Sequence, residues 1–222
     1  MPIINMVYKK KKWWKPWANT VAYYPLEWDT LDYSWNNRNW TNSNVTFSNW
    51  VAYFNGSNAM VTIAHDSWNK IQNNMTICAW FKSEDLNGTV VWKFQSNPTS
   101  TQNMYYRMWL IDWKAYWWFC NWSDWNIYPS YGDRVYVNID EWHLLTLTNN
   151  WTTKTLYVDK IQAAQSTAGN TATNSNIPLT IWNMTYYNIQ SRFKWNIKSV
   201  ILEDKTWSLA DISDYYDNNK PN

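Results

Sequence analysis

The stretch Met75-Thr76-Ile77-Cys78-Ala79-Trp80-Phe81-Lys82 has an apolar residue at every odd-numbered position, which is the clearest β-strand pattern in this chain. Successive residues of a β-strand point to opposite faces of a sheet, so the odd-numbered residues from Met75 to Phe81 share one face. These residues are all apolar, and we expect them to face a core between two sheets. The even-numbered residues, from Thr76 to Lys82, should point the other way.

Short apolar or alternating runs recur on both sides of this stretch, separated by Asn, Ser, Asp, Gly and Trp, and helical periodicity is nearly absent. This pattern is typical of an all-β sandwich, and 222 residues suit a single domain of that kind. The other expected strands are 21–26, 51–54, 60–63, 90–94, 104–111, 114–120, 135–137, 142–148, 155–158, 179–181 and 195–202.

One helical signal stands near the C-terminus, where Ser208 can cap a helix and Asp211 takes its third position. We expect a short helical turn there. Residues 1–18 should form a disordered basic tail, residues 19–217 the domain, and residues 218–222 a frayed end, with fraying expected from Asp217 onward.

Tryptophan and glycine occur in unusual proportions, with 21 Trp and 4 Gly, although average usage of Gly is about 7%. Many of the tryptophans stand among turn formers, as in Asp32-Tyr33-Ser34-Trp35-Asn36, where a residue that tolerates positive φ is expected. We interpret most of them as glycines of the natural protein, encoded by UGA in one of the bacteria that read this codon as Gly. The alternative is an authentic Trp-rich binding surface.

This interpretation predicts two groups of tryptophan. Trp80 and Trp142 should lie in regular strands. The second group should lie in turns or at strand ends, mostly exposed and several with positive φ: Trp28, Trp35, Trp40, Trp68, Trp122, Trp125 and Trp151.

Charge and hydropathy exclude several classes of protein. The net charge of +2 is small, and the cluster from Lys9 to Lys12 is expected to be a solvated tail, so we expect no nucleic-acid partner. No apolar run of about 18 residues is present, so no membrane span is expected. The basic N-terminal stretch is not followed by an apolar segment, and no Sec signal is visible.

The cysteines and histidines offer no recognisable metal site. Cys78 and Cys120 are expected to be unpaired, partly buried thiols rather than a disulfide. His65 and His143 lack a partner at a zinc-like spacing, which favours structural roles for both. No cofactor is therefore assigned.

Several segments, taken in order over about residues 20–217, resemble the laminin-G-like branch of the concanavalin A-like lectin/glucanase superfamily. They include Ala52-Tyr53-Phe54-Asn55-Gly56-Ser57, the stretches 75–82, 141–148 and 193–200, and the closing Trp207-Ser208-Leu209-Ala210-Asp211-Ile212. The resemblance implies a jelly-roll sandwich of two antiparallel sheets with a glycan-binding or protein-binding role.

The same alignment bears on the tryptophans. It places Trp80 and Trp142 where the family carries Trp, and Trp28, Trp35 and Trp195 where it carries Gly. Asp159 is followed directly by Lys160 where the family usually has Gly, so that hairpin is expected to be shortened.

Glucanases of this fold use a Glu-x-Asp-x-x-Glu strand, to which Glu27-Trp28-Asp29-Thr30-Leu31-Asp32 is similar. The last position is Asp32, one methylene shorter, and the resemblance places the segment in a loop. We therefore expect turn-capping carboxylates and no hydrolase activity. Oxygens of Asp29, Asp32 and Asn36 would suit Ca²⁺, but no diagnostic spacing supports that ion.

An aromatic platform with flanking amides and carboxylates would suit a sugar, whose apolar face stacks on rings while polar groups orient its hydroxyls. The candidate ligand-binding residues are Tyr105, Arg107, Tyr116, Tyr131 and Asp133. The competing interpretation is that about half of the aromatic residues in this region pack the core.

These observations favour a non-catalytic recognition module on a cell surface or a virion, with a glycan as its partner. The alternative is a structural or protein-interaction module of a phage tail fibre or adhesin, with a surface protein as its partner.

Overall fold

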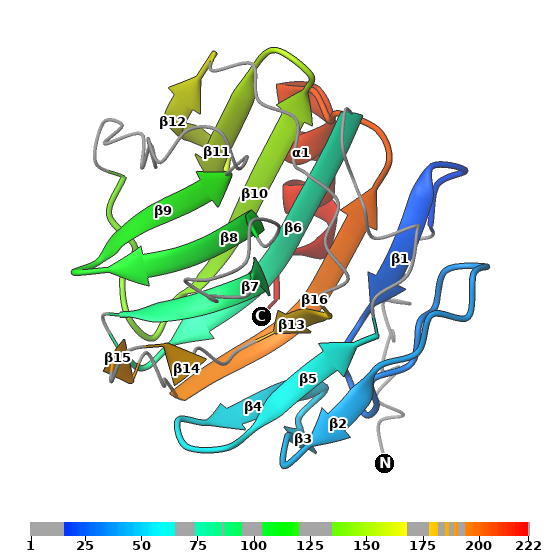
Figure 1. Ribbon diagram of the computed structural model, residues 1–222, viewed down its shortest axis with the longest axis vertical. Helices are drawn as coiled ribbons and strands as arrows, with labels where there is room; N and C mark the ends of the chain where they lie inside the picture. The colour runs from blue at the N-terminus through cyan, green and yellow to red at the C-terminus, as the bar shows by residue number, and fades with distance from the viewer. Residues whose placement is uncertain are drawn as a thin grey trace, which may run out of the picture.

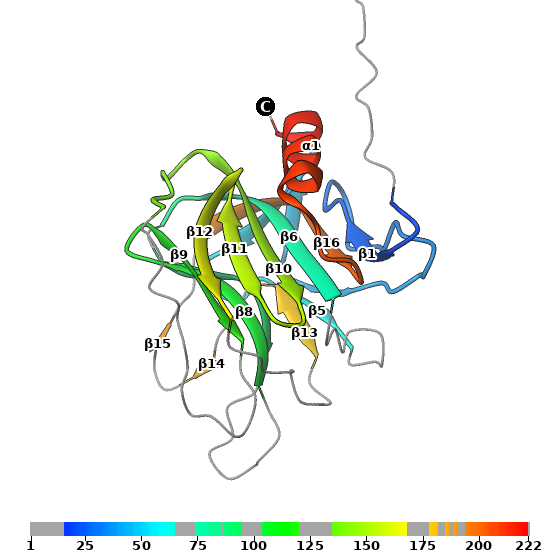
Figure 2. The same cartoon turned by 90° about the horizontal axis from the view of Figure 1, so that it is seen from above.

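The computed structural model describes residues 16–64, 74–85, 87–94, 104–119, 135–167, 178–181, 185–186, 189–190 and 194–221. These residues form two antiparallel sheets packed face to face, as Figure 1 shows. One helix lies on the outside of the larger sheet, which is clearest from above in Figure 2. The predicted jelly-roll sandwich is confirmed.

The larger sheet forms one layer and contains eight of the described strands. Their order is β12 (Ile161–Ser166), β11 (Lys154–Val158), β10 (Trp142–Asn150), β6 (Asn74–Ser83), β16 (Lys194–Glu203), β4 (Val51–Asn55) and β3 (Thr46–Ser48), and β1 (Thr20–Tyr24) also pairs with β16.

The smaller sheet forms the other layer. Its described order is β2 (Thr41–Ser43), β5 (Met60–Ile63), β13 (Leu179–Ile181), β7 (Gly88–Phe94), β8 (Met104–Ile111) and β9 (Lys114–Phe119). A separate pair is made by β14 (Thr185–Tyr186) and β15 (Ile189–Gln190).

The predicted strand at 135–137 is wrong, because this segment makes only an isolated bridge between Tyr136 and Lys114. The short strands β2 and β3 were not predicted, because three mostly polar residues carry too little alternation to detect. The edge strand β12 was also missed, since Ile161–Ser166 has a single β-branched apolar residue.

The alternation of β6 is confirmed. Its apolar set lies in the main core between the sheets, where Phe81 packs against Trp195 with ring centroids 5.1 Å apart. Cys78 and Trp80 point to the opposite face and form a second buried cluster with residues of the helix. Cys78 is a free, buried thiol as predicted, and Cys120 lies outside the described residues.

Helix α1 (Leu209–Asn219) begins with the predicted cap. The Ser208 hydroxyl accepts a hydrogen bond from the Asp211 amide at 3.2 Å, and the Asp211 carboxylate accepts one from the Ser208 amide at 2.8 Å. The helix has eleven residues instead of a single turn, so residues 217–219, expected to fray, are helical. Ile212 and Tyr215 are buried against the larger sheet, and this tertiary packing extends the helix beyond its local signal.

The end of the predicted N-terminal tail also belongs to the domain. Trp17 packs against Trp207, with ring centroids 5.1 Å apart, and its carbonyl accepts a hydrogen bond from the Thr20 amide at 3.0 Å. Residues 1–15 lie outside the described part of the chain.

The predicted division of the tryptophans holds in part. Trp80 and Trp142 lie in β6 and β10, as expected. Trp28, Trp35 and Trp151 are exposed in loops, and Trp151 has a φ of 74°.

The prediction fails for the backbone of Trp28 and Trp35 and for the exposure of Trp40, and three other tryptophans are not described by the structure. Trp28 and Trp35 do not have positive φ. Trp40 is only 6% exposed and packs against Tyr24, with ring centroids 3.7 Å apart, because its side chain fills the core instead of a turn surface. Trp68, Trp122 and Trp125 lie outside the described residues.

Two hairpin turns contain tryptophans that the prediction did not single out. Asn49 and Trp50 join β3 to β4 with φ values of 52° and 64°, and Asp112 and Trp113 join β8 to β9 with 47° and 69°. Two consecutive positive φ values in a two-residue hairpin are the geometry of a type I′ turn, which favours Asn-Gly or Asp-Gly. Trp therefore stands where this geometry favours Gly.

We expect Trp113→Gly to raise the free energy of unfolding by about 1 kcal/mol, because Gly adopts positive φ without the steric cost that Trp incurs. Urea unfolding of the wild type and the variant would measure this difference. The matched control is Trp35→Gly, which removes a residue that is 87% exposed and has no positive φ, and which should give no such gain. Destabilisation by Trp113→Gly would refute the strain argument.

Glu203, at the end of β16, is fully buried, and its carboxylate accepts a hydrogen bond from the Thr20 hydroxyl at 2.6 Å. Burial raises the pKa of Glu203 from 4.5 to about 7, and the Thr20 hydrogen bond only partly offsets this effect. The folded state therefore holds a proton that the unfolded state releases between these two pH values. The contribution of this proton to stability is complete below pH 4.5 and is lost as the pH rises to about 7.

We expect Glu203→Gln to remove this dependence, because an amide stays neutral at every pH in the window. The variant should gain stability relative to the wild type between pH 4.5 and 7, by up to roughly 3 kcal/mol. Urea unfolding of both proteins at several pH values gives the difference curve. A difference that does not change with pH would show that Glu203 titrates alike in both states.

Candidate functional site

Arg107, Trp109 and Tyr116 form a stack on the outer face of the smaller sheet. Arg107 and Trp109 alternate along β8 with Met108, which faces the main core, so both point away from it. The guanidinium carbon of Arg107 lies 4.3 Å from the centroid of the Trp109 ring. Tyr116, opposite Trp109 in β9, stacks on the same ring with centroids 5.7 Å apart and planes 21° apart.

The guanidinium of Arg107 is held in place by β7. Its Nε and Nη2 atoms donate hydrogen bonds to the Thr89 hydroxyl, at 3.3 and 2.9 Å. Arg107 is 9% exposed, and burial lowers its pKa to about 9, so it remains charged at neutral pH. The sheet therefore carries a fixed cation beside two stacked rings, of which Trp109 is buried and Tyr116 is partly exposed.

The structure brings together two of the five predicted site residues, Arg107 and Tyr116. It places Tyr105 in β8, two positions before Arg107, and Tyr131 and Asp133 lie outside the described residues. Trp109 and Thr89 were not predicted. Alternation along β8 could have indicated Trp109, whereas Thr89 depends on a register shift between β7 and β8 that the sequence does not reveal.

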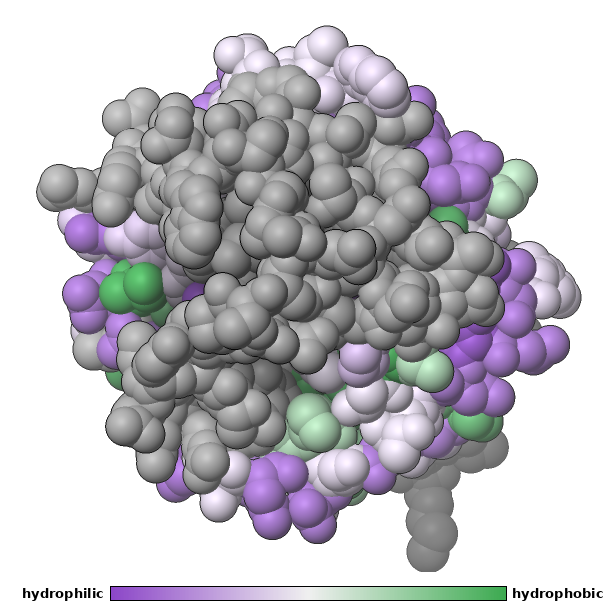
Figure 3. Space-filling model, in the orientation of Figure 1, coloured by the Kyte–Doolittle hydropathy of each residue, from purple (hydrophilic) through white to green (hydrophobic). Residues whose placement is uncertain are grey.

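Figure 3 shows the molecule in the orientation of Figure 1. Among its coloured residues, hydrophilic ones are frequent along the rim and hydrophobic ones are scattered. The coloured part of this face therefore lacks the extended apolar patch that commonly marks a protein interface.

A groove of about 640 Å³ opens on the outer face of the larger sheet, beside the start of α1. We call it the Tyr157 groove. Most of its lining residues carry a polar group, and apolar atoms also contribute to its surface: Asn19, Asn74, Thr148, Asn150, Thr153, Thr155, Tyr157, Gln165, Asp204, Lys205, Thr206, Trp207 and Ser208.

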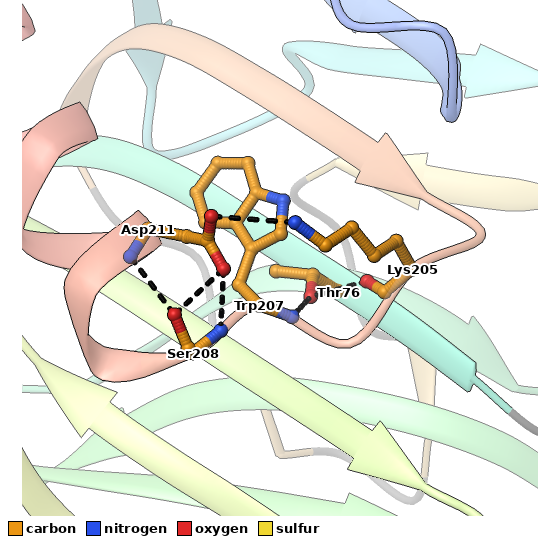
Figure 4. A network of polar contacts seen from close by, with 5 residues as sticks. All are labelled: Thr76, Lys205, Trp207, Ser208 and Asp211. Atoms are coloured by element: carbon orange, nitrogen blue, oxygen red, sulfur yellow. Dashed lines mark hydrogen bonds and ion pairs between the residues drawn. The ribbon is translucent and has the colours of Figure 1, made fainter.

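The loop that forms one wall of the groove is fixed to β6, as Figure 4 shows. The Thr76 hydroxyl donates to the Lys205 carbonyl and accepts from the Trp207 amide, both at 2.8 Å. The Lys205 ammonium lies 3.3 Å from the Asp211 carboxylate at the helix start. These contacts hold residues 204–208 against the sheet, so the wall is built before any ligand arrives.

Of the carboxylates in the glucanase-like segment, Asp32 caps its turn as predicted, whereas Glu27 does not. Glu27 is buried and pairs with Lys198 at 3.0 Å. Asp32 accepts hydrogen bonds from the amides of Tyr23, Ser34 and Arg38, at 2.8–3.0 Å. Its oxygens, considered above as calcium ligands, are thus used to organise the turn.

His143 has the structural role expected for it. Its Nδ1 atom lies 3.0 Å from the carboxylate of Asp159, which also accepts from the Leu144 amide at 2.8 Å. Asp159 and Lys160 form the two-residue turn between β11 and β12. Asp159 itself adopts positive φ, at 57°. His65 lies outside the described residues.

Among the described residues, no group of three or more His, Cys, Asp and Glu side chains is arranged to hold a metal ion. None of the described helices has both the length and the apolar character needed to cross a membrane.

Solved structures share this fold at low sequence identity. The binding domain of Paraclostridial Mosquitocidal Protein 1 superposes with a TM-score of 0.71 at 15% identity, covering 89% of this chain and 52% of that one. The binding domain of Botulinum Neurotoxin DC in complex with SialylT gives 0.68 at 13%, covering 90% and 51%. The chain thus spans about half the length of these toxin domains.

Domain 4 of AbnA, an extracellular arabinanase from Geobacillus stearothermophilus in complex with arabinotriose, matches over nearly its whole length. It gives a TM-score of 0.69 at 14% identity, covering 89% of this chain and 98% of that one. No curated protein sequence matches the chain. A family model for the concanavalin A-like lectin/glucanases superfamily matches residues 55–213, and the chain therefore belongs to this superfamily.

Proposed function

We propose that this chain is a non-catalytic recognition module that binds a glycan on the outer face of its smaller sheet. The observation that carries the proposal is the stack of Arg107, Trp109 and Tyr116, with the guanidinium fixed by Thr89. Aromatic rings cover the apolar face of a sugar, and fixed donors select its hydroxyl or carboxylate oxygens.

Two of the related structures support the ligand class. The arabinanase domain is described in complex with arabinotriose, and the neurotoxin domain in complex with SialylT. Their identities to this chain are low, so they support the ligand class by analogy of fold. In our proposal Tyr105, Tyr131 and Asp133 complete the site around the stack.

We also propose that the module is displayed outside the cell or on a virion. The toxin domains and the extracellular arabinanase support a setting outside the cell. The competing function is a protein-interaction module of a tail fibre or adhesin, with a surface protein as its partner.

The identity of the tryptophans bears directly on this site, because Trp109 is its central ring. The positive φ values of Trp50, Trp113 and Trp151 support our hypothesis that the natural protein carries Gly at turn positions. Trp109 lies in a regular strand between two stacking partners. We therefore propose that Trp109 is an authentic tryptophan and that the turn residues are glycines encoded by a reassigned UGA codon.

Glycan-array binding tests the function. We expect Arg107→Ala and Tyr116→Ala each to weaken binding at least tenfold, since each removes one layer of the stack or its cation. Arg107→Lys keeps the charge but loses the planar stacking surface, so it should also bind weakly while remaining folded. As a control, Trp35→Ala removes an aromatic side chain that is 87% exposed and lies outside the stack, so this variant should bind like the wild type.

Equal glycan binding by the wild type and all three site variants would exclude this face. Absence of binding to every glycan by the folded wild type would favour the protein-interaction module instead.

Peptide mass spectrometry of the protein isolated from its natural source tests the codon proposal. We expect the masses of Gly at positions 50, 113 and 151 and of Trp at position 109. Trp at the three turn positions would refute the reassignment, and Gly at 109 would remove the central ring from the proposed site.

A further inference from the structure

We infer that the Tyr157 groove is a second ligand site, which takes a short neutral oligosaccharide. It lies on the outer face of the larger sheet, and the Arg107 stack lies on the outer face of the smaller sheet. The inference therefore does not depend on the proposed function, and either site can exist without the other.

The groove is open to solvent and has two walls, each held by hydrogen bonds. Thr155 and Tyr157 project from β11 on the face opposite the buried Leu156, next to Thr148 of β10. The second wall is the loop that Thr76 fixes to β6. A volume of about 640 Å³ falls in the usual range of roughly 300–1,000 Å³ for small-molecule sites.

The first wall is also ordered internally. The Thr148 hydroxyl lies 3.4 Å from the Thr155 carbonyl, and the Gln165 amide donates to the Thr155 hydroxyl at 3.3 Å. The Asn150 side chain accepts from the Thr153 amide at 2.7 Å and so fixes the hairpin at the rim. A ligand would therefore meet side chains that are already oriented, which lowers the entropic cost of binding.

Several polar groups of the lining are available to a ligand. Among the described residues, the Asn74 amide, the Thr153 and Tyr157 hydroxyls and the Asp204 carboxylate make no hydrogen bond or ion pair. Together they offer donors from the amide and hydroxyls and strong acceptors from the carboxylate. The half-buried ring of Tyr157 adds an apolar surface. This combination suits a polyhydroxylated ligand with one apolar face.

The charges of the groove select against an anionic ligand. Among the described residues that line it, the one cationic side chain is Lys205, which is paired with Asp211, and the carboxylate of Asp204 is exposed. The N-terminus of α1 does not compensate, because Ser208 and Asp211 already cap each other. A neutral sugar is therefore favoured over a sialylated or sulfated one.

Titration of the folded protein by NMR, with cellotriose, mannotriose and arabinotriose as neutral probes and sialyllactose as the anionic probe, tests the inference. We expect at least one neutral trisaccharide to shift the signals of Tyr157 and Thr153, and sialyllactose to shift them less. Tyr157→Ala and Asp204→Ala should each raise the dissociation constant of that trisaccharide about tenfold or more.

Matched variants separate loss of contact from loss of structure. Asp214→Ala removes another exposed carboxylate, on α1, and should bind as the wild type does. Tyr157→Phe keeps the ring and removes the hydroxyl, so its affinity should fall between the wild type and Tyr157→Ala. Arg107→Ala should leave the trisaccharide signals at the groove unchanged.

The inference is overturned if no neutral trisaccharide binds the folded wild type at concentrations up to tens of millimolar. It is also overturned if binding survives both groove variants, or if sialyllactose binds the groove more tightly than the neutral probes. Loss of binding in Arg107→Ala alone would support the proposed function and overturn the second site.

Discussion

Strand β6 is buried on both of its faces, and this burial determines where the helix and the loop before it lie. An antiparallel sheet commonly leaves one face to water, but β6 carries Trp80 and Cys78 on the face turned away from the sandwich core. These side chains require a cover, and Trp207, Ile212 and Tyr215 supply it. The position of α1, and of the loop before it, therefore follows from the side chains of one strand.

This dependence explains why sequence reasoning succeeded for the sheets and fell short for the helix. The period of two in β6 is a local signal, and the strand adopts it because both neighbours, β10 and β16, pair along its length. The length of α1 is set by contacts with residues more than a hundred positions away, such as Trp80. The capping pair at Ser208 marks where the helix begins but carries no information on where it ends.

The two proposed sites also differ in how far the sequence could predict them. Arg107 and Tyr116 could be predicted because they lie in clear strands and belong to residue types that bind sugars. The lining of the Tyr157 groove could not, because it combines side chains from residue 19 to residue 208. The pairing of β6, β10, β11 and β12 and the loop that Thr76 fixes bring these side chains together. The burial of Glu203 could not be predicted for a related reason, because the Thr20 side chain that contacts its carboxylate comes from β1, far away in the sequence.

The two outer faces of a sandwich point in opposite directions, so no short ligand can touch both. Occupation of both faces would therefore not raise the affinity for a single short oligosaccharide. It would instead tie one polymer to another through the thickness of a single domain, and such cross-links form networks whose strength depends on the number of partners. With both proposed sites occupied, the module would therefore link two chains rather than bind one chain more tightly.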